Sequence, residues 1–247
     1  MDEEDKSVTR RALLAGSVTL AFGGGVAYLA TDSGGSEDDY RPASFYTSDK
    51  TTDFGNGVDL TGRPIVGERD APLDIYYWTD YLCPFCKEFE TKTLPEIGRN
   101  YLDTGDARLV MLGYPNIGEY SEPAAVWGRC VWAQVAESDP MAFWNWNGAA
   151  FDAQVAGGND WADEETFREI TEQTSGVNLD SVEECRESRG EAIRRNLDAD
   201  VDVALSAGIQ GTPGFVIYNR ESGAAGKLIG AHPYENFADA LDQVREA

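Results

Sequence analysis

The sequence predicts an α/β fold in which a small sheet is interrupted by an all-helical insertion. Three observations predict it. An apolar run from Leu73 to Thr79 precedes a helical pattern, and a second apolar run follows from Ala107 to Tyr114. Strand pattern then returns at Gly214, after roughly 90 residues of helical periodicity. Strands that alternate with helices are typical of α/β folds, and 247 residues suffice for one ample core.

The first part of the folded domain is expected over residues 63–118. Pro64 to Gly67 is a short strand candidate, and the run that starts at Leu73 is long enough for a buried strand. A helix should follow Cys83, and Pro95 should bend or break it, because proline lacks the N–H that a helix interior needs. The apolar run at Ala107 is expected to form a central strand.

The helical insertion is expected over residues 119–207. Helical patterns begin near five positions, the fourth of which has a capping-box pattern: Pro123, Met141, Asp163, Ser181 and Ile193. The α/β domain should then resume over residues 208–247. Its expected elements are a strand at Gly214 to Tyr218, a partner strand at Lys227 to Gly230 and a final amphipathic helix from Tyr234 to Val244.

Residues 1–30 have the features of a targeting segment. Arg10 and Arg11 precede nineteen uncharged residues, Ala12 to Ala30, and this pattern resembles a twin-arginine export signal. The alternative is an N-terminal membrane anchor, because roughly 20 apolar residues span a bilayer. Both interpretations place the rest of the chain outside the cytoplasm. Residues 31–62 are expected to be an acidic polar linker.

The charge of the chain is strongly acidic. There are 44 Asp and Glu residues against 20 Lys and Arg residues, which gives a net charge of −24. Only five of the basic residues are lysines. Such a surface tolerates molar salt, where the Debye length is about 3 Å, so the composition favours a halophilic protein over an ordinary acidic one. The sequence has no basic patch for phosphates, and nucleic acid is therefore excluded as a partner.

A Cys-x-x-Cys motif lies between the first long strand and the helix after it. Cys83 is expected at the start of that helix, where unpaired N–H groups and the helix dipole favour a thiolate. Pro84 suits the first helical turn. We therefore expect Cys83 to be a redox nucleophile and Cys86 to be the thiol that resolves its mixed disulfide. A structural disulfide or half of a metal site would be the alternative.

A second motif, Gly211 to Val216, contains Pro213 directly before a buried strand. A cis peptide bond at Pro213 would present the Thr212 backbone beside the two thiols, where it could hydrogen-bond an extended peptide. A proline in an ordinary trans turn is the alternative.

The segment from Tyr76 to Cys86, together with Gly208 to Phe215, resembles the DsbA family of thiol–disulfide oxidoreductases. The resemblance implies a thioredoxin fold with a helical insertion, an exposed nucleophile at Cys83 and a buried partner at Cys86. It also implies a cis proline at Pro213, preceded by Thr212. It further implies that the enzyme donates its disulfide to unfolded or reduced exported proteins and is re-oxidised by a membrane quinone-linked partner.

The chain departs from the best-known strongly oxidising members between the two cysteines. Phe85 stands where those members have a histidine, so a donor that favours the thiolate is missing and a less oxidising potential is expected. Phe85 and Tyr81 are apolar-rim candidates for unfolded substrate, with simple packing as the alternative, and Pro84 should also contact substrate. Asp80 either moves protons to and from Cys86 or, as we prefer, caps the helix start or a turn.

The other two cysteines, Cys130 and Cys185, each lie on a helix of the insertion. We expect a structural disulfide between them, with two buried free thiols as the alternative. The single histidine, His232, is expected in a surface turn. With one histidine and no second Cys-x-x-Cys, the sequence offers no zinc site, and we expect neither a metal nor a cofactor.

The sequence therefore predicts an extracytoplasmic thiol–disulfide oxidoreductase. Within the same class, a reductase or isomerase remains open, because the direction of electron flow depends on the redox partner. From another class, a non-catalytic chaperone or a copper metallochaperone with this fold is the rival. Three methionines and one histidine make a poor supply of copper ligands.

Overall fold

The computed structural model describes residues 40–55, 57–156 and 158–247. The expected targeting segment at residues 1–30 lies outside the described residues, as does the part of the expected linker before Tyr40. Within the described ranges, no helix has the length and apolar character needed to cross a membrane.

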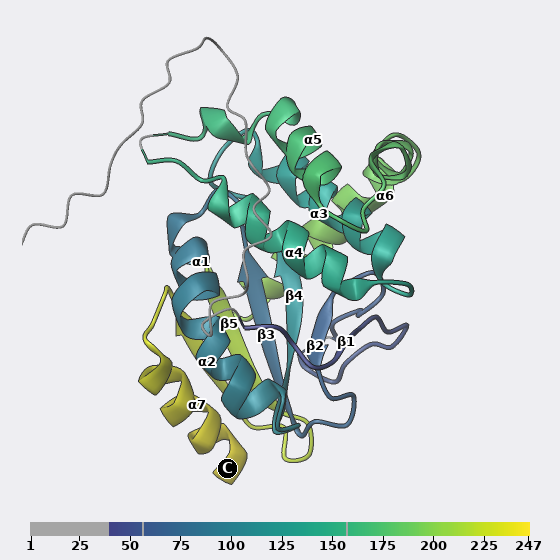
Figure 1. The fold of residues 1–247 in the computed structure, drawn as a ribbon. Coiled ribbons are helices and arrows are strands. Elements are labelled where there is room, and N and C mark those ends of the chain that lie inside the picture. Colours follow the sequence, from purple (N-terminus) through teal and green to yellow (C-terminus); the bar gives the residue numbers. More distant parts are fainter. Residues whose placement is uncertain (1–39, 56, 157) are drawn as a thin grey trace, which may run out of the picture. The chain divides into compact units, whose positions relative to one another are not determined.

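A six-stranded sheet with the order β1-β2-β4-β3-β5-β6 forms the centre of the fold (Figure 1). The long strands β3 (Leu73–Thr79) and β4 (Ala107–Gly113) pair in parallel, and every other pairing is antiparallel. The remaining strands are β1 (Phe45–Tyr46), β2 (Ile65–Gly67), β5 (Gly214–Asn219) and β6 (Ala225–Ile229). Every residue of β4 is buried, as expected for a central strand.

The parallel pair requires a crossover, and a helical segment from residue 84 to residue 102 makes it. It consists of α1 (Pro84–Glu88), the π-helical η1 (Phe89–Thr93), α2 (Leu94–Ile97) and the π-helical η2 (Gly98–Leu102). Pro95 lies in the first turn of α2, directly after η1. The predicted interruption at Pro95 is therefore confirmed as a change of helix type, which accommodates the missing N–H.

The helices between β4 and β5 form the insertion. They are α3 (Ser121–Val135), α4 (Pro140–Asp152), the 3₁₀ turn η3 (Asp160–Ala162), α5 (Glu164–Gln173) and α6 (Leu179–Ser206). The sequence predicted two helices where α6 is a single one, and that prediction is wrong. The side chain of Asn178 caps α6 by accepting a hydrogen bond from the Ser181 N–H, so the predicted helix start at Ser181 lies inside the first turn.

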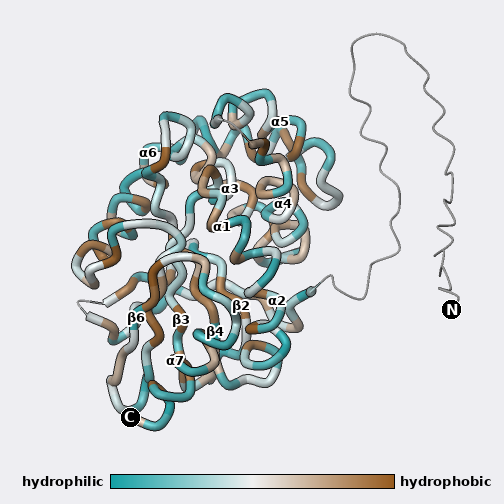
Figure 2. Tube along the Cα trace, turned by 90° about the vertical axis from the view of Figure 1, so that its left-hand side faces the viewer, coloured by the Kyte–Doolittle hydropathy of each residue, from teal (hydrophilic) through white to brown (hydrophobic). Residues whose placement is uncertain are grey.

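Helices cover the sheet in two groups (Figure 1). The C-terminal helix α7 (Tyr234–Glu246) runs beside α2 and contacts β5, whereas α3 to α6 gather beyond one end of β3 and β4. The central strands carry long apolar stretches, while much of the helical surface is hydrophilic (Figure 2). Alternate side chains of β3 enter different parts of the core, with Tyr77 facing α1 and α7 and Trp78 facing away from them.

Residues 40–62 belong to the folded domain, and their assignment to a linker is wrong. Tyr40, Tyr46, Val58 and Leu60 are all buried, and β1 pairs with β2. The last three of these side chains cover the sheet face that carries Trp78. A few apolar residues within a polar stretch thus suffice to hold it against a sheet face that α7 leaves open.

A buried carboxylate joins the insertion to the sheet. Asp200 of α6 accepts hydrogen bonds from Arg63 Nε at 2.7 Å, from Arg129 of α3 at 2.7 Å and from the Gly113 N–H at 3.0 Å. Its backbone carbonyl accepts a hydrogen bond from Trp78 Nε1 at 2.8 Å. This cluster anchors α6 to the carboxyl ends of β3 and β4, next to the Cys-x-x-Cys.

Candidate active site

Cys83 precedes the crossover helix and is its N-cap residue. Its backbone is extended, with φ −80° and ψ 116°, and Pro84 occupies the first helical turn. The Cys83 carbonyl accepts hydrogen bonds from the N–H groups of Cys86 at 3.1 Å and Lys87 at 3.2 Å. The end of β3 and the start of α1 thus hold both thiols in the position that the sequence predicted.

Asp80 has a structural role in this turn. One carboxylate oxygen accepts a hydrogen bond from the Leu82 N–H at 2.9 Å. The other accepts from the N–H groups of Asn116 at 2.8 Å and Ile117 at 3.0 Å. Since both oxygens bind backbone N–H groups outside α1, the geometry favours the capping of a turn over a proton-transfer role for Asp80, and α1 itself has no side-chain cap.

The Thr212–Pro213 peptide bond is cis, and the loop lies against the dithiol. The Cys83 thiol donates a hydrogen bond to the Thr212 carbonyl oxygen at 3.2 Å. The Pro213 carbonyl accepts a hydrogen bond from the Gly230 N–H of the β6 end at 2.7 Å. The two sequence motifs, far apart in the chain, therefore meet in one site.

Cys83 is less exposed than expected, with only 2% of its surface accessible, and Cys86 is completely buried. The expectation of an exposed nucleophile is thus wrong, because Thr212 covers the sulfur. Tyr81 is also buried, with its ring against Trp146 and its hydroxyl on Asn147 at 3.1 Å. The rim interpretation therefore fails for Tyr81, because it packs into the insertion.

The two thiols differ strongly in acidity. A hydrogen bond from the Cys86 thiol, with weaker help from Thr212 and the backbone N–H groups of Cys86 and Phe85, lowers the pKa of Cys83 to about 6 against the opposing effect of burial. Burial raises the pKa of Cys86 well above its usual range, and the neighbouring Cys83 raises it further. A thiolate at Cys83 beside a protonated Cys86 can attack a disulfide and can also leave readily.

The insertion holds the active-site turn through contacts that the sequence did not reveal. Gln154, just after α4, donates from Nε2 to the carbonyl oxygens of Tyr81 at 2.6 Å and Cys83 at 3.2 Å. Lys87 Nζ donates to the Asp152 carbonyl at 3.2 Å. No local pattern marks Gln154, because its partners lie about 70 residues earlier in the chain.

Exposed apolar side chains lie on segments that contact the active-site turn or the cis-proline loop. Phe85, between the cysteines, is 59% exposed and Val155, which follows Gln154, is 62% exposed. Ile117 binds Asp80 through its N–H, and Ile229 pairs with Gly214 beside the cis proline. Four of the five exposed large apolar side chains in the described ranges therefore adjoin this site, and the fifth is Leu205.

The other two cysteines form a disulfide. Cys130 of α3 and Cys185 of α6 are joined by an S–S bond of 2.12 Å, with their Cα atoms 5.7 Å apart. His232 lies in the loop between β6 and α7 and contacts the Ile229 carbonyl. In the described part of the chain, no three His, Cys, Asp or Glu side chains form a cluster that could hold a metal ion.

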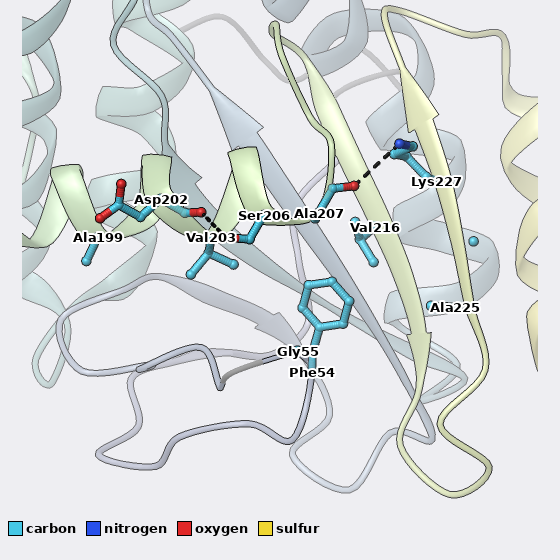
Figure 3. Close-up of a pocket in the computed structure, with 11 residues that line it drawn as sticks. Phe54, Gly55, Ala199, Asp202, Val203, Ser206, Ala207, Val216, Ala225 and Lys227 are labelled. Atoms are coloured by element: carbon cyan, nitrogen blue, oxygen red, sulfur yellow. Dashed lines mark hydrogen bonds between the residues drawn. The ribbon is translucent and has the colours of Figure 1, made fainter.

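A pocket of about 660 Å³ opens between α6, the β5–β6 hairpin and residues 54–55 (Figure 3). Its lining is largely apolar, and Lys227 donates from Nζ to the Ala207 carbonyl at its edge. Neither cysteine of the motif lines this pocket. This cavity is therefore separate from the dithiol.

Comparisons with known proteins agree with this geometry. The thioredoxin family model matches residues 60–243. The chain is 27% identical to disulfide bond formation protein D of Bacillus subtilis over 187 residues, which are 76% of each chain.

Solved structures share the fold. The oxidised form of BdbD from Bacillus subtilis has a TM-score of 0.63 at 22% identity and covers 75% of this chain and 94% of its own. Wolbachia pipientis α-DsbA1 has a TM-score of 0.63 at 20% identity, with 76% and 94% covered. The chain therefore belongs to the thioredoxin family, and its fold, a thioredoxin fold with a helical insertion, is similar to that of DsbA-like thiol–disulfide oxidoreductases.

Proposed function

We propose that the protein forms or exchanges disulfides in exported proteins through a mixed disulfide on Cys83. The observation that carries the proposal is the asymmetry of the two thiols. Cys83 has a pKa of about 6 and lies beside the cis-proline loop, whereas Cys86 is buried and protonated. A nucleophile and a distinct partner thiol are what stepwise dithiol exchange requires.

Oxidation of a client protein then takes two exchanges. A client thiolate attacks the sulfur of Cys83 in the oxidised enzyme, the Cys83–Cys86 bond breaks, and Cys86 leaves with the electron pair. A second client thiolate attacks the client sulfur of the mixed disulfide, and Cys83 leaves as a thiolate. The low pKa of Cys83 favours the second departure. The client is oxidised by two electrons and the enzyme is reduced to its dithiol.

The surroundings of the dithiol support an unfolded client. The exposed side chains of Phe85, Val155, Ile117 and Ile229 offer apolar contacts to a client. An unfolded chain has exposed apolar side chains to meet them, whereas a folded protein has few. In this proposal Pro84 and Phe85 contact the client on one side of Cys83. Thr212 and Pro213 contact it on the other side, where the client lies extended beside Thr212.

The proposed setting is outside the cytoplasm. The paired arginines and the uncharged stretch at residues 12–30 support export by a twin-arginine route, with or without retention of the segment as an anchor. The acidic, lysine-poor composition supports work at high salt. A membrane quinone-linked oxidant would return the dithiol to the disulfide by accepting its two electrons.

Covalent trapping tests the proposal. A reduced client protein is mixed with oxidised wild-type enzyme or with Cys86→Ser enzyme carrying an activated Cys83 disulfide, and the products are separated without reductant. Wild-type enzyme should release oxidised client. With a client that has a single thiol, the Cys86→Ser variant should accumulate a mixed disulfide, because neither Cys86 nor a second client thiol is present to break it. Cys83→Ser should do neither. Binding of client without turnover or trapping would instead identify a chaperone and overturn the proposal.

A second experiment tests the apolar surroundings. Phe85→Ser combined with Val155→Ser should slow the oxidation of an unfolded protein and leave exchange with dithiothreitol nearly unchanged, since the small dithiol needs no apolar contact. Leu205→Ser, at the exposed apolar residue of α6, is the matched control. Equal rates for the double variant and the control would remove these two residues from the client site.

A further inference from the structure

A small cavity lies where helices α3 and α6 of the insertion meet the segment before β2. Its volume is about 40 Å³, and it shares no lining residue with the larger pocket of Figure 3. No acidic residue of the described chain is among those that line it, which are Thr61, Gly62, Arg63, Arg129, Ala133, Arg189, Ile193 and Asn196. Three arginines around one cavity contrast with a chain that has 44 acidic and 20 basic residues.

Two of the three arginines are buried and share one carboxylate. The side chains of Arg63 and Arg129 are 4% and 12% exposed, and each has an Nη2 atom within 2.7 Å of the carboxylate of Asp200. Burial and the neighbouring Arg63 lower the pKa of Arg129, although Asp200 opposes them. Asp59 lies 3.9 Å from Arg63 Nη1, but its side chain is 57% exposed and water screens its charge. Two buried positive charges therefore face one buried negative charge.

Backbone carbonyls bind the remaining N–H groups of these arginines without changing the net charge. Arg63 donates to the carbonyl oxygens of Thr61 at 3.1 Å and Asn196 at 3.3 Å. Arg129 donates to the carbonyl oxygen of Gly62 at 2.9 Å. Since the residues that supply these carbonyls also line the cavity, both guanidinium groups lie at its wall.

Arg189 of α6 brings a third positive charge to the cavity. Its side chain is exposed, and no hydrogen bond or ion pair joins it to another residue in the described part of the chain. Thr61 and Asn196 add a hydroxyl and an amide to the lining. A space lined by one sign of charge concentrates ions of the opposite sign, so an anion is the species that this cavity favours.

The volume of the cavity limits what it can hold. A water molecule needs about 10 to 15 Å³, so 40 Å³ admits a species of one or two water volumes and excludes phosphate and larger anions. We propose that the cavity binds one chloride ion between the guanidinium groups of Arg63, Arg129 and Arg189. The ion supplies the negative charge that the buried arginines lack, since a buried charge without a partner is costly.

The proposed site has a consequence for stability that does not depend on the function of the dithiol. Its arginines come from the segment before β2, from α3 and from α6, and these segments meet only in the folded chain. Chloride should therefore bind the folded state and not the unfolded state, and should stabilise the contact between the insertion and the sheet. Salt would thus act on this protein through a specific ion as well as by screening its acidic surface.

Urea unfolding of the full-length oxidised protein at different chloride concentrations tests the proposal. Sodium chloride is replaced stepwise by sodium gluconate at a constant total of about 1 M, so that the screening of surface charge stays the same. Gluconate is too large for the cavity. The unfolding equilibrium constant should fall by up to about 10-fold as chloride rises from about 0.1 to about 1 M, which is the limit for one site.

Three variants separate the cavity from general effects of salt. Arg189→Gln removes an exposed charge from the cavity, so the protein should fold and lose most of its chloride dependence. Arg195→Gln makes the same change at an exposed position of α6 outside the cavity and should keep the wild-type dependence. Ala133→Glu places a carboxylate at the cavity wall. Its unfolding constant in low chloride should approach that of wild type in high chloride, with no further dependence.

NMR of the chlorine nucleus gives a readout that is independent of unfolding. The chloride signal should broaden in the presence of folded wild-type protein or Arg195→Gln, and should broaden much less with Arg189→Gln or Ala133→Glu. Equal stability in chloride and gluconate would show that the cavity holds only water and would overturn the proposal. So would a chloride dependence that Arg189→Gln retains, or one that Arg195→Gln loses to the same extent as Arg189→Gln.

Discussion

The Cys83 sulfur lies 3.2 Å from the carbonyl oxygen of Thr212, although 129 positions separate the two residues in the chain. This contact places the nucleophile beneath the cis-proline loop and explains why only 2% of Cys83 is accessible. The loop that would hold a client chain is thus the same loop that shields the thiol.

The acidity of Cys83 should depend on Cys86. Ultraviolet absorbance of the thiolate in the reduced protein should titrate with a midpoint at about pH 6. Cys86→Ala removes the hydrogen bond that contributes most to this lowering, so the midpoint should move upward. Cys130 and Cys185 are bonded to each other and do not absorb as thiolates. An unchanged midpoint in Cys86→Ala would show that the backbone N–H groups and Thr212 suffice.

The reduction potential should fall between those of the strongest oxidants and thioredoxin, on a scale of roughly −120 to −270 mV. The low pKa of Cys83 stabilises the reduced form, but the apolar side chain of Phe85 adds no hydrogen bond to the one that its backbone N–H gives the thiolate. Equilibration with glutathione measures the potential. Phe85→His should shift it toward the oxidising end. A wild-type value already at that end would refute the inference drawn from Phe85.

The disulfide between Cys130 and Cys185 should stabilise the insertion. It closes a loop of 55 residues, which corresponds to about 4 kcal/mol in the chain-entropy model. The double variant Cys130→Ser, Cys185→Ser should lose free energy of unfolding of this order, as measured with denaturant. Its activity should change little, because the disulfide acts by restricting the denatured state. Peptide mapping without reductant should recover the pair. Two alkylatable thiols at these positions in the oxidised protein would contradict it.

Glu90 should destabilise the protein at alkaline pH. Its pKa rises from 4.5 to about 7 on folding, so the folded state binds the extra proton between these values. Stability from this group is therefore retained below about pH 4.5 and is lost as pH rises through about 7. Glu90→Gln should be more stable than wild type at pH 8, by up to about 3 kcal/mol, and similar at pH 4. Urea unfolding at both pH values makes the comparison. If the pKa of Glu90 is not raised, the free energy of unfolding of Glu90→Gln will differ from that of wild type by the same amount at pH 4 and at pH 8.

Asp200 should be indispensable for the packing of the insertion. Asp200→Asn leaves the guanidinium groups of Arg63 and Arg129 buried without their carboxylate, which costs about 3 to 5 kcal/mol. The exposed Asp198 of the same helix gives the matched control, and Asp198→Asn should lie within about 0.5 kcal/mol of wild type. Thermal unfolding of the three proteins makes the comparison, and equal stabilities would exclude a structural role for this cluster.

Local signals in the sequence were sufficient to predict most helices and strands and to identify Cys83 and Cys86 as the reactive thiols. Periodicity located β3, β4, the insertion and the terminal helix, because those patterns depend on which face of each element is buried. The Cys-x-x-Cys and the Thr-Pro motif are likewise local, and their chemistry follows from residue type and position beside a strand. The length of α6 was missed because periodicity alone does not show whether the two successive helical patterns, from Ser181 and from Ile193, belong to one helix.

What the sequence by itself determined is therefore the order of the elements and the identity of the two thiols. Only the tertiary structure decided the environment of those thiols: the shielding of Cys83 by Thr212, the hold of Gln154 on the turn and the buried carboxyl of Glu90. It also decided that the chain from Tyr40 onward covers the sheet. The physical reason is that burial and pKa depend on atoms brought together across many residues, whereas periodicity reports only on neighbours along the chain.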